Sequence, residues 1–250
     1  MAMKPFPPSL LSTSLYEVTL HFSGTDEQFD RLFSNIDSDF VIPGRLSSMI
    51  LSLASEEKIL TDILLRRMLK KGRIETLRLS ASYVTDCSLA RLPERMILNL
   101  SELEVDRNIH DVGSLLTKIS AVEHNLKSVV LEQCGNLDDG LMKAMFRSNS
   151  KLENLQISNC QKIAGDFLYK LGMKCLKISS LSLVNCYSVS EKNVLLFLQA
   201  NRESSESLER LTINSSFIGE SIANSISLYC PNLTTLNLRT THTKGKDLET

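Results

Sequence analysis

The sequence predicts an α/β solenoid in which parallel strands line a concave face, helices cover the convex face and a helical cap closes the N-terminal end. Three observations predict this fold: an aliphatic pattern that recurs along the chain, a constant spacing between its copies, and helical periodicity within the intervals. The expected boundaries are residues 1–72 for the cap and 73–250 for about seven repeats. The hydrophobic share of 42% suits a folded globular protein.

The recurring pattern is apolar-x-x-apolar-x-apolar-x-x-small or polar. Its copies begin at Ile74, Leu100, Leu126, Leu152, Ile178, Leu208 and Leu233, which gives steps of 26, 26, 26, 26, 30 and 25 residues. The alternating apolar residues lie on one face of a short strand. A single strand cannot bury that face alone, so neighbouring units must stack to form a continuous core.

The remainder of each unit predicts a helix on the outer side. Apolar residues recur every fourth position in the third, fourth and sixth units, which is the periodicity of a helix face. The residues concerned are Leu137, Leu141 and Met145; Ile163, Phe167 and Leu171; and Ile218, Ile222 and Ile226.

Five of the six cysteines keep a fixed place in the repeat. Cys134, Cys160 and Cys186 occupy the last position of successive units, while Cys175 and Cys230 lie three residues before the first. Zinc or disulfide bonds are the alternatives to a small buried thiol, but no Cys-x-x-Cys pair is present. Other units place Ser82, Asn108, Ser216 and Thr241 in the same last position, so we expect no metal there. Cys87 has no assigned role.

This frame resembles the cysteine-containing subclass of leucine-rich repeats, which is common in substrate-recognition subunits of ubiquitin ligases. The resemblance covers residues 74–250. It implies a leucine-rich-repeat solenoid that binds another protein.

Composition and motifs argue against several other functions. The net charge of −1 provides no general attraction to nucleic acid or anionic membranes. The first residues lack the apolar stretch of a signal peptide, and no segment reaches the roughly 20 apolar residues of a membrane span. We therefore expect a cytoplasmic or nuclear protein that contacts neither nucleic acid nor membrane.

No recognisable catalytic motif is present, so we expect a protein without enzymatic activity and without a cofactor. Asp138 and Asp139 follow a predicted turn, where an acidic helix start explains them better than catalysis. The histidines are scattered at His21, His110, His124 and His242.

The first seventy residues fit the repeat less well. Leu15, Val18 and Leu20, and then Leu46, Met49 and Leu51, roughly match the frame and could mark two degenerate repeats. We favour a helical cap, because the end of a solenoid must cover its core. Residues 55–72 predict one helix with Ser55 as N-cap, Ile59, Ile63 and Leu64 on one face and Gly72 as its stop, and residues 28–36 predict a shorter amphipathic segment.

Two segments of this region resemble ligase-binding motifs. Residues 13–22 resemble the Elongin C-binding box of ubiquitin-ligase receptors, although Thr19 replaces the usual cysteine and Ser23 the usual aliphatic residue. The alternative is the buried stripe of a capping helix or strand. Residues 40–46 resemble the cullin box in the form used with the second cullin. The implied contacts are Ser14, Leu15, Val18, Thr19 and Phe22 for Elongin C, and Ile42, Pro43 and Leu46 for the cullin.

The order of box, helical spacer and cysteine-containing repeats resembles the Zyg-eleven and Zer-one family of substrate receptors. That family continues into an armadillo-like domain, which this chain does not show, so an N-terminal portion or a shortened relative is expected. The resemblance implies a non-catalytic substrate-recognition or adaptor subunit of a cullin-RING ubiquitin ligase, joined through Elongin B and Elongin C. The alternative is a generic or F-box-type leucine-rich-repeat scaffold without an Elongin link.

The third, fifth and seventh positions of each unit should face the concave side. In the second and third units these positions gather four carboxylates, while Arg210 and Arg239 lie in later units. A client protein with a basic segment would fit the acidic end, and a solvated face without a partner is the alternative. The candidate client-binding residues are Glu102, Glu104, Asp106 and Glu132.

Overall fold

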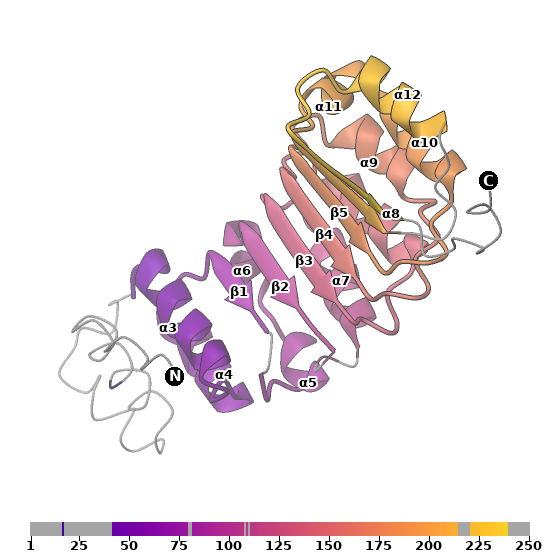
Figure 1. Ribbon diagram of the computed structural model, residues 1–250. Coiled ribbons are helices and arrows are strands. Elements are labelled where there is room, and N and C mark those ends of the chain that lie inside the picture. Colours follow the sequence, from indigo (N-terminus) through magenta and orange to yellow (C-terminus); the bar gives the residue numbers. More distant parts are fainter. Residues whose placement is uncertain are drawn as a thin grey trace, which may run out of the picture.

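A computed structural model describes residue 17 and residues 42–79, 82–107, 109, 111–214 and 221–239. The predicted strands form one parallel sheet whose spatial order follows the chain from β1 to β7. Their bounds are β1 Thr76–Arg78, β2 Glu102–Val105, β3 Ser128–Glu132, β4 Asn154–Ser158, β5 Ser180–Val184, β6 Arg210–Asn214 and β7 Thr235–Arg239. Figure 1 shows these strands lying side by side in one curved sheet, so that each strand is one rung of the solenoid. The predicted leucine-rich-repeat solenoid is confirmed.

Pairing between strands follows the repeat without a shift. The fourth position of each unit pairs with the fourth position of the next, from Leu77 with Leu103 at one end to Leu211 with Leu236 at the other. The backbone repeats this geometry: Glu75 carbonyl oxygen accepts from the N–H groups of Ser101 and Glu102, and Ser101 carbonyl oxygen accepts from those of Lys127 and Ser128. The constant interval in the sequence is therefore the number of residues that the chain needs to pass from one strand to the next.

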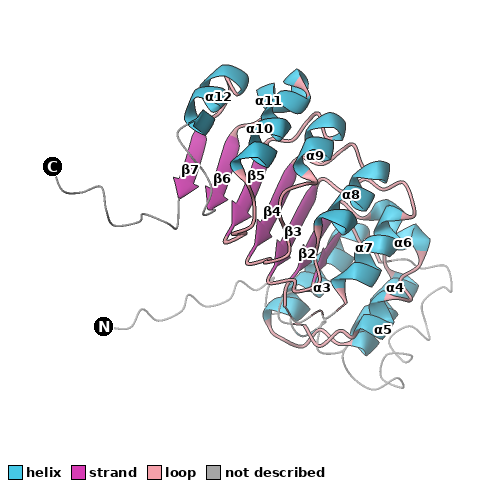
Figure 2. Ribbon diagram, turned by 90° about the vertical axis from the view of Figure 1, so that its right-hand side faces the viewer, coloured by secondary structure: helices cyan, strands magenta, loops and turns pink. Residues whose placement is uncertain are grey.

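Helices connect successive strands and cover the outer side of the sheet, as Figure 2 shows. They are α5 Asp86–Leu89, α6 Glu94–Asn99, α7 Val112–Ser120, α8 Asp139–Ser148, α9 Leu168–Lys174, α10 Glu191–Ala200, α11 Arg202–Glu206 and α12 Ser221–Tyr229. The apolar residues with helical spacing are mostly buried, but the helices begin later than expected. Ile163 and Phe167 lie in the segment before α9 rather than in the helix, and both are buried in the core.

The helix starts follow capping chemistry. Asp138 is the N-cap of α8, and its carboxylate accepts a 2.8 Å hydrogen bond from the Leu141 N–H group. Asp139 accepts from the N–H groups of Ala164, Gly165 and Phe167 in the next repeat. The interpretation of this acidic pair as a helix start is confirmed, and Asp139 also ties two units together.

The core runs along the whole solenoid. In the first six units the first, fourth and sixth pattern positions are at most 1% exposed. In the last described unit Leu236 is 46% exposed, because no later strand covers β7 among the described residues. Burial of the apolar stripe thus depends on a neighbour at each side.

Within residues 42–79, which the structure describes, two helices precede the sheet: α3 (Gly44–Glu56) and α4 (Asp62–Lys71). The predicted single helix over residues 55–72 is wrong at its start. Ser55 belongs to α3, the chain turns through Lys58 with a φ of 58°, and Thr61 is the N-cap of α4. Ile63, expected on the buried face, is 50% exposed. Gly72 is the C-cap, as predicted.

The segment with Leu46, Met49 and Leu51 is helical, so it is not a degenerate strand. Within α3 the Ser48 hydroxyl oxygen accepts hydrogen bonds from the N–H groups of Glu75 (3.1 Å) and Thr76 (3.0 Å). In later units a main-chain carbonyl oxygen of the preceding rung accepts the equivalent pair. Ser48 therefore supplies the hydrogen-bond acceptor that a preceding strand would otherwise provide at the edge of β1. Residues 28–36 lie outside the described residues.

Helices α9 and α10 approach closely at Gly172. A β-carbon there would lie 2.8 Å from the Ala200 β-carbon and 2.9 Å from the Phe197 carbonyl oxygen. We expect Gly172→Ala to lower the free energy of unfolding by about 1–3 kcal/mol, because the added methyl group overpacks the helix contact. Urea unfolding measures the loss. Gly135→Ala is the matched control, since no atom lies within 4 Å of its added β-carbon. Equal losses would contradict the packing argument.

Candidate functional site

The concave face presents the odd-numbered pattern positions, as predicted. Glu102, Glu132, Gln156, Arg210 and Asn237 are exposed. Ser158 departs from the pattern, because it is only 7% exposed. Apart from that position, the described side chains at these places are accessible along the length of the sheet. The face is therefore available to a partner over several consecutive rungs.

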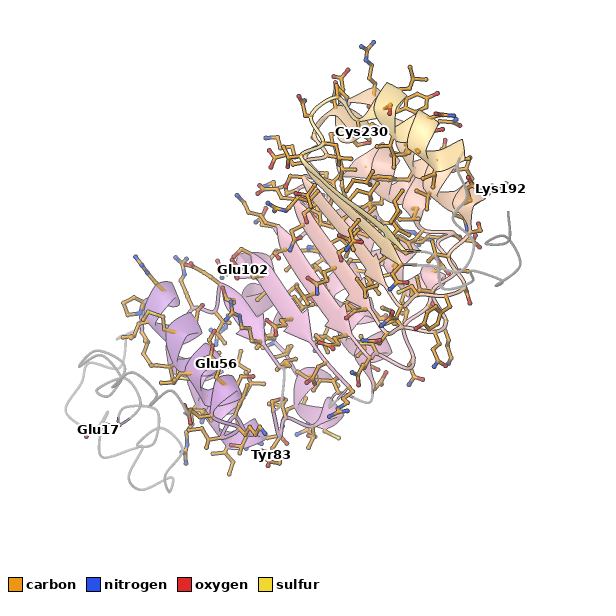
Figure 3. All side chains as sticks on the ribbon, in the orientation of Figure 1. Glu17, Glu56, Tyr83, Glu102, Lys192 and Cys230 are labelled. Atoms are coloured by element: carbon orange, nitrogen blue, oxygen red, sulfur yellow. The ribbon has the colours of Figure 1, made fainter. Side chains whose placement is uncertain are left out.

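Glu102, Glu104, Asp106 and Glu132 form what we call the acidic surface. Glu102 and Glu104 lie on β2 and Glu132 lies on the adjacent β3. Asp106 directly follows β2, and it is separated from Glu132 by one repeat. Adjacent strands lie about 4.8 Å apart, so these carboxylates belong to one patch. Figure 3 shows Glu102 on the strand face, near the N-terminal helices.

Arg78 on β1 borders the acidic surface and partly neutralises it. Its Nε lies 3.4 Å from Glu104 Oε2, and its Nη1 lies 3.7 Å from Glu56 Oε1 on α3. The Thr76 hydroxyl donates a 3.3 Å hydrogen bond to Glu102 Oε2. These groups are substantially exposed, so each ion pair contributes little to stability. Their effect is to hold the carboxylates in place beside the sheet.

A groove of about 410 Å³ lies between α3 and the first two strands. Met49 and Leu53 supply apolar surface from α3, and Glu56 adds a carboxylate that the sequence did not assign to the site. Sequence reasoning missed this wall because the position of α3 against β1 depends on Ser48 rather than on the repeat. The lining residues are Arg45, Ser48, Met49, Ser52, Leu53, Glu56, Glu75, Thr76, Arg78 and Glu102.

The residues of the predicted cullin box are placed differently from one another. Ile42 is 3% exposed, and its carbonyl oxygen accepts hydrogen bonds from Ser47 Oγ and the Arg73 N–H group. Pro43 is the N-cap of α3. Leu46 is 40% exposed, and Met49, one turn later, is 36% exposed. The exposed face of α3, rather than Ile42, is therefore the accessible part of this segment.

The predicted Elongin C contacts lie outside the described residues. They are Ser14, Leu15, Val18, Thr19 and Phe22.

The repeat cysteines are buried and free. Each of Cys134, Cys160 and Cys186 directs its thiol at the carbonyl oxygen two residues earlier, as in the 3.3 Å contact from Cys160 Sγ to Ser158 oxygen. Burial raises the pKa of both Cys175 and Cys186 to about 12, so these thiols stay protonated at neutral pH. The interpretation of the slot as a packing position is confirmed. Cys87 is exposed on α5.

The described residues contain no group of three or more His, Cys, Asp or Glu side chains that could hold a metal ion. None of the described helices is long and apolar enough to span a membrane.

Among solved structures, the chain is similar to the complex of Rad7 and Elc1 in yeast. The match has a TM-score of 0.56 at 15% sequence identity and covers 91% of this chain and 62% of that chain. It therefore shows the fold. This chain spans less than two thirds of the length of the chain that it matches. No protein-family model matches the sequence, and no curated protein matches it either.

Proposed function

We propose that this chain is a non-catalytic adaptor that holds a client protein on its concave face. The observation that carries the proposal is the acidic surface, in which four carboxylates from adjacent rungs share an accessible face. A rigid parallel sheet positions such groups without the entropy cost of ordering loops on binding. The groove beside α3 extends this face with apolar contacts from Met49 and Leu53.

The client that fits this surface carries a basic segment. Charge complementarity across an interface accelerates association and selects among partners. The groove would accept an apolar side chain next to that segment, because Met49 is partly exposed there. A protein is thus a better fit than a small molecule.

We further propose that the chain delivers this client to a cullin-RING ubiquitin ligase, with Elongin B and Elongin C as linkers. The support is the resemblance of residues 13–22 and 40–46 to the two ligase boxes, and of the whole order to the Zyg-eleven and Zer-one receptors. The fold is also similar to that of Rad7, which was solved in complex with another protein, Elc1. We expect a protein with this role to be located in the cytoplasm or nucleus. A leucine-rich-repeat scaffold without a ligase link is the second candidate.

Substitution in the two boxes tests the ligase link. We expect Leu15→Asp in the full chain to abolish capture of Elongin B and Elongin C, because fully burying a leucine contributes about 1.5–3 kcal/mol and a charge cannot enter an apolar pocket. Loss of Elongin should remove the cullin as well. Pull-down of purified components measures both.

Leu46→Asp is the matched variant on the exposed face of α3. It should weaken cullin capture and leave Elongin capture intact, because Leu46 belongs to the cullin box and is already 40% exposed. Thermal unfolding verifies that both variants stay folded. Undiminished Elongin capture by Leu15→Asp, or no Elongin capture by the unchanged chain, favours the scaffold without a ligase link.

A further inference from the structure

A second hollow lies at the edge of the solenoid where helices end and the next strands begin. Its volume is about 520 Å³, and the ends of α6, α8 and α9 and the loops before β3 and β4 line it. Its charged lining residues are Arg147, Lys151, Lys174 and Glu123, so three cations and one carboxylate give a net charge of +2. We call it the basic pocket. Its charge is opposite to that of the acidic surface.

More cations lie beside the basic pocket. Lys143 and Arg147 are four residues apart on α8, and Lys170 and Lys174 are four residues apart on α9, so each pair shares a helix face. Burial lowers the pKa of Lys170, and the charges of Arg147, Lys174 and Lys143 lower it further. Within the described ranges, none of these four makes an ion pair with a carboxylate. Their mutual repulsion would be relieved by an anion.

Helix dipoles explain only part of this cluster. Arg147 and Lys174 lie in the last turns of α8 and α9, where a cation is favoured. Lys143 and Lys170 lie before those turns, and Lys151 follows α8 in the loop to β4. The helix dipole therefore accounts for Arg147 and Lys174 but not for Lys143, Lys170 or Lys151.

One of the cationic donors at the pocket, Lys151, is held by a hydrogen bond. Lys151 Nζ donates a 2.6 Å hydrogen bond to Asn125 Oδ1, which leaves its other two N–H groups for a ligand. Ser150 is exposed beside it. The guanidinium of Arg147 offers a planar fork of donors that matches the oxygens of a phosphate or carboxylate. Three cations and a hydroxyl thus converge from two consecutive repeats and the loop between them.

His124 also lines the pocket, and it is 4% exposed with neither ring nitrogen hydrogen-bonded. Burial lowers its pKa to about 4, and the Met145 carbonyl opposes the shift without reaching hydrogen-bonding geometry. The ring is consequently neutral at physiological pH. It contributes an uncharged wall, as Phe146 and Leu98 do. The positive charge of the pocket comes from Arg147, Lys151 and Lys174 alone.

We propose that the basic pocket binds the phosphate monoester of a phosphorylated side chain on a protein partner. Such a group carries a charge of about −2 at neutral pH and three acceptor oxygens, which suits a site with several cationic donors better than a single carboxylate does. The pocket has room beyond the phosphate itself, and Leu98, which is 47% exposed, offers apolar surface to the rest of the side chain. The site is separate from the acidic surface and goes beyond the function proposed above.

Titration of the full chain with two small probes tests this proposal. The probes are inorganic phosphate and N-acetyl-phosphoserine N-methylamide at constant ionic strength, followed by amide NMR shifts. We expect saturable shifts at Asn125, Ser150 and Lys151, and tighter binding of the phosphoserine probe. The double variant Arg147→Met/Lys174→Met should weaken binding by about tenfold or more, because it removes the charge-assisted hydrogen bonds. Lys151→Met provides an independent variant.

The matched control is Lys192→Met, which removes an exposed lysine on α10, outside the pocket and labelled in Figure 3. It should bind both probes as the unchanged chain does. Absence of saturable shifts, or equal weakening by the control, overturns the site. Equal affinity for inorganic phosphate and the phosphoserine probe overturns the protein-borne source. Tighter binding of a single-stranded oligonucleotide, lost in the same variants, overturns it in favour of nucleic acid.

Discussion

Replacing Leu155 with alanine should lower the free energy of unfolding by about 2–5 kcal/mol, because it leaves a cavity in the most enclosed part of the core. Leu155 lies on β4, pairs in register with Val129 and Leu181, and is 0% exposed. Strands on both sides hold its surroundings, so the core cannot easily collapse into the space. Urea unfolding followed by circular dichroism measures the change.

Leu236→Ala is the matched control, since Leu236 holds the same pattern position on β7 but is 46% exposed. Its loss should fall well below that of Leu155→Ala, because half of the side chain already contacts solvent. A comparable loss at both sites would mean that β7 is covered in solution. The pair therefore tests whether burial in this fold depends on having two neighbouring rungs.

The strands could be predicted because their positions depend on one periodic property. Each rung repeats the same alternation at the same interval, so Leu103, Val129 and Leu155 had to be aligned once the chain formed a solenoid. The acidic surface could be predicted for the same reason, since the alternation of side chains along a strand places Glu102 and Glu132 on the concave face. Periodic information in the sequence was sufficient for both.

The N-terminal helices could not be placed in this way. The break between α3 and α4 depends on a left-handed turn at Lys58 and a cap at Thr61, which are local features that an apolar pattern does not report. The contact of α3 with β1 depends on one hydroxyl, that of Ser48. Glu56 and the groove beside the acidic surface were missed for this reason.

The basic pocket was missed although a signal was present. Lys143 and Lys170 are 27 residues apart, as are Arg147 and Lys174. Positions separated by about one repeat lie on neighbouring units, so the cations could have been grouped from the sequence. These cations lie on α8 and α9, whereas the alternation of the strands predicts only which side chains face the concave side.

Reversing two charges of the acidic surface should weaken client binding by about 10- to 100-fold, which corresponds to about 1.4–3 kcal/mol. The change is Glu102→Lys/Glu104→Lys, which replaces two carboxylates on β2 with cations that repel a basic segment. The client is first identified by mass spectrometry from capture on the full chain, and its purified form is then measured by calorimetry. The control is Glu94→Lys/Glu209→Lys, two exposed carboxylates outside the acidic surface.

Arg78→Met gives the opposite expectation and so separates charge from shape. Arg78 lies 3.4 Å from Glu104 and 3.7 Å from Glu56, so its removal takes a neighbouring positive charge away from both carboxylates. Affinity for a basic segment should rise, and the dependence on salt should become steeper. The ion pairs are exposed, so stability should change by less than about 1 kcal/mol. If Arg78→Met weakens binding as the reversed pair does, the client contacts Arg78 itself, and the basic-segment model is wrong.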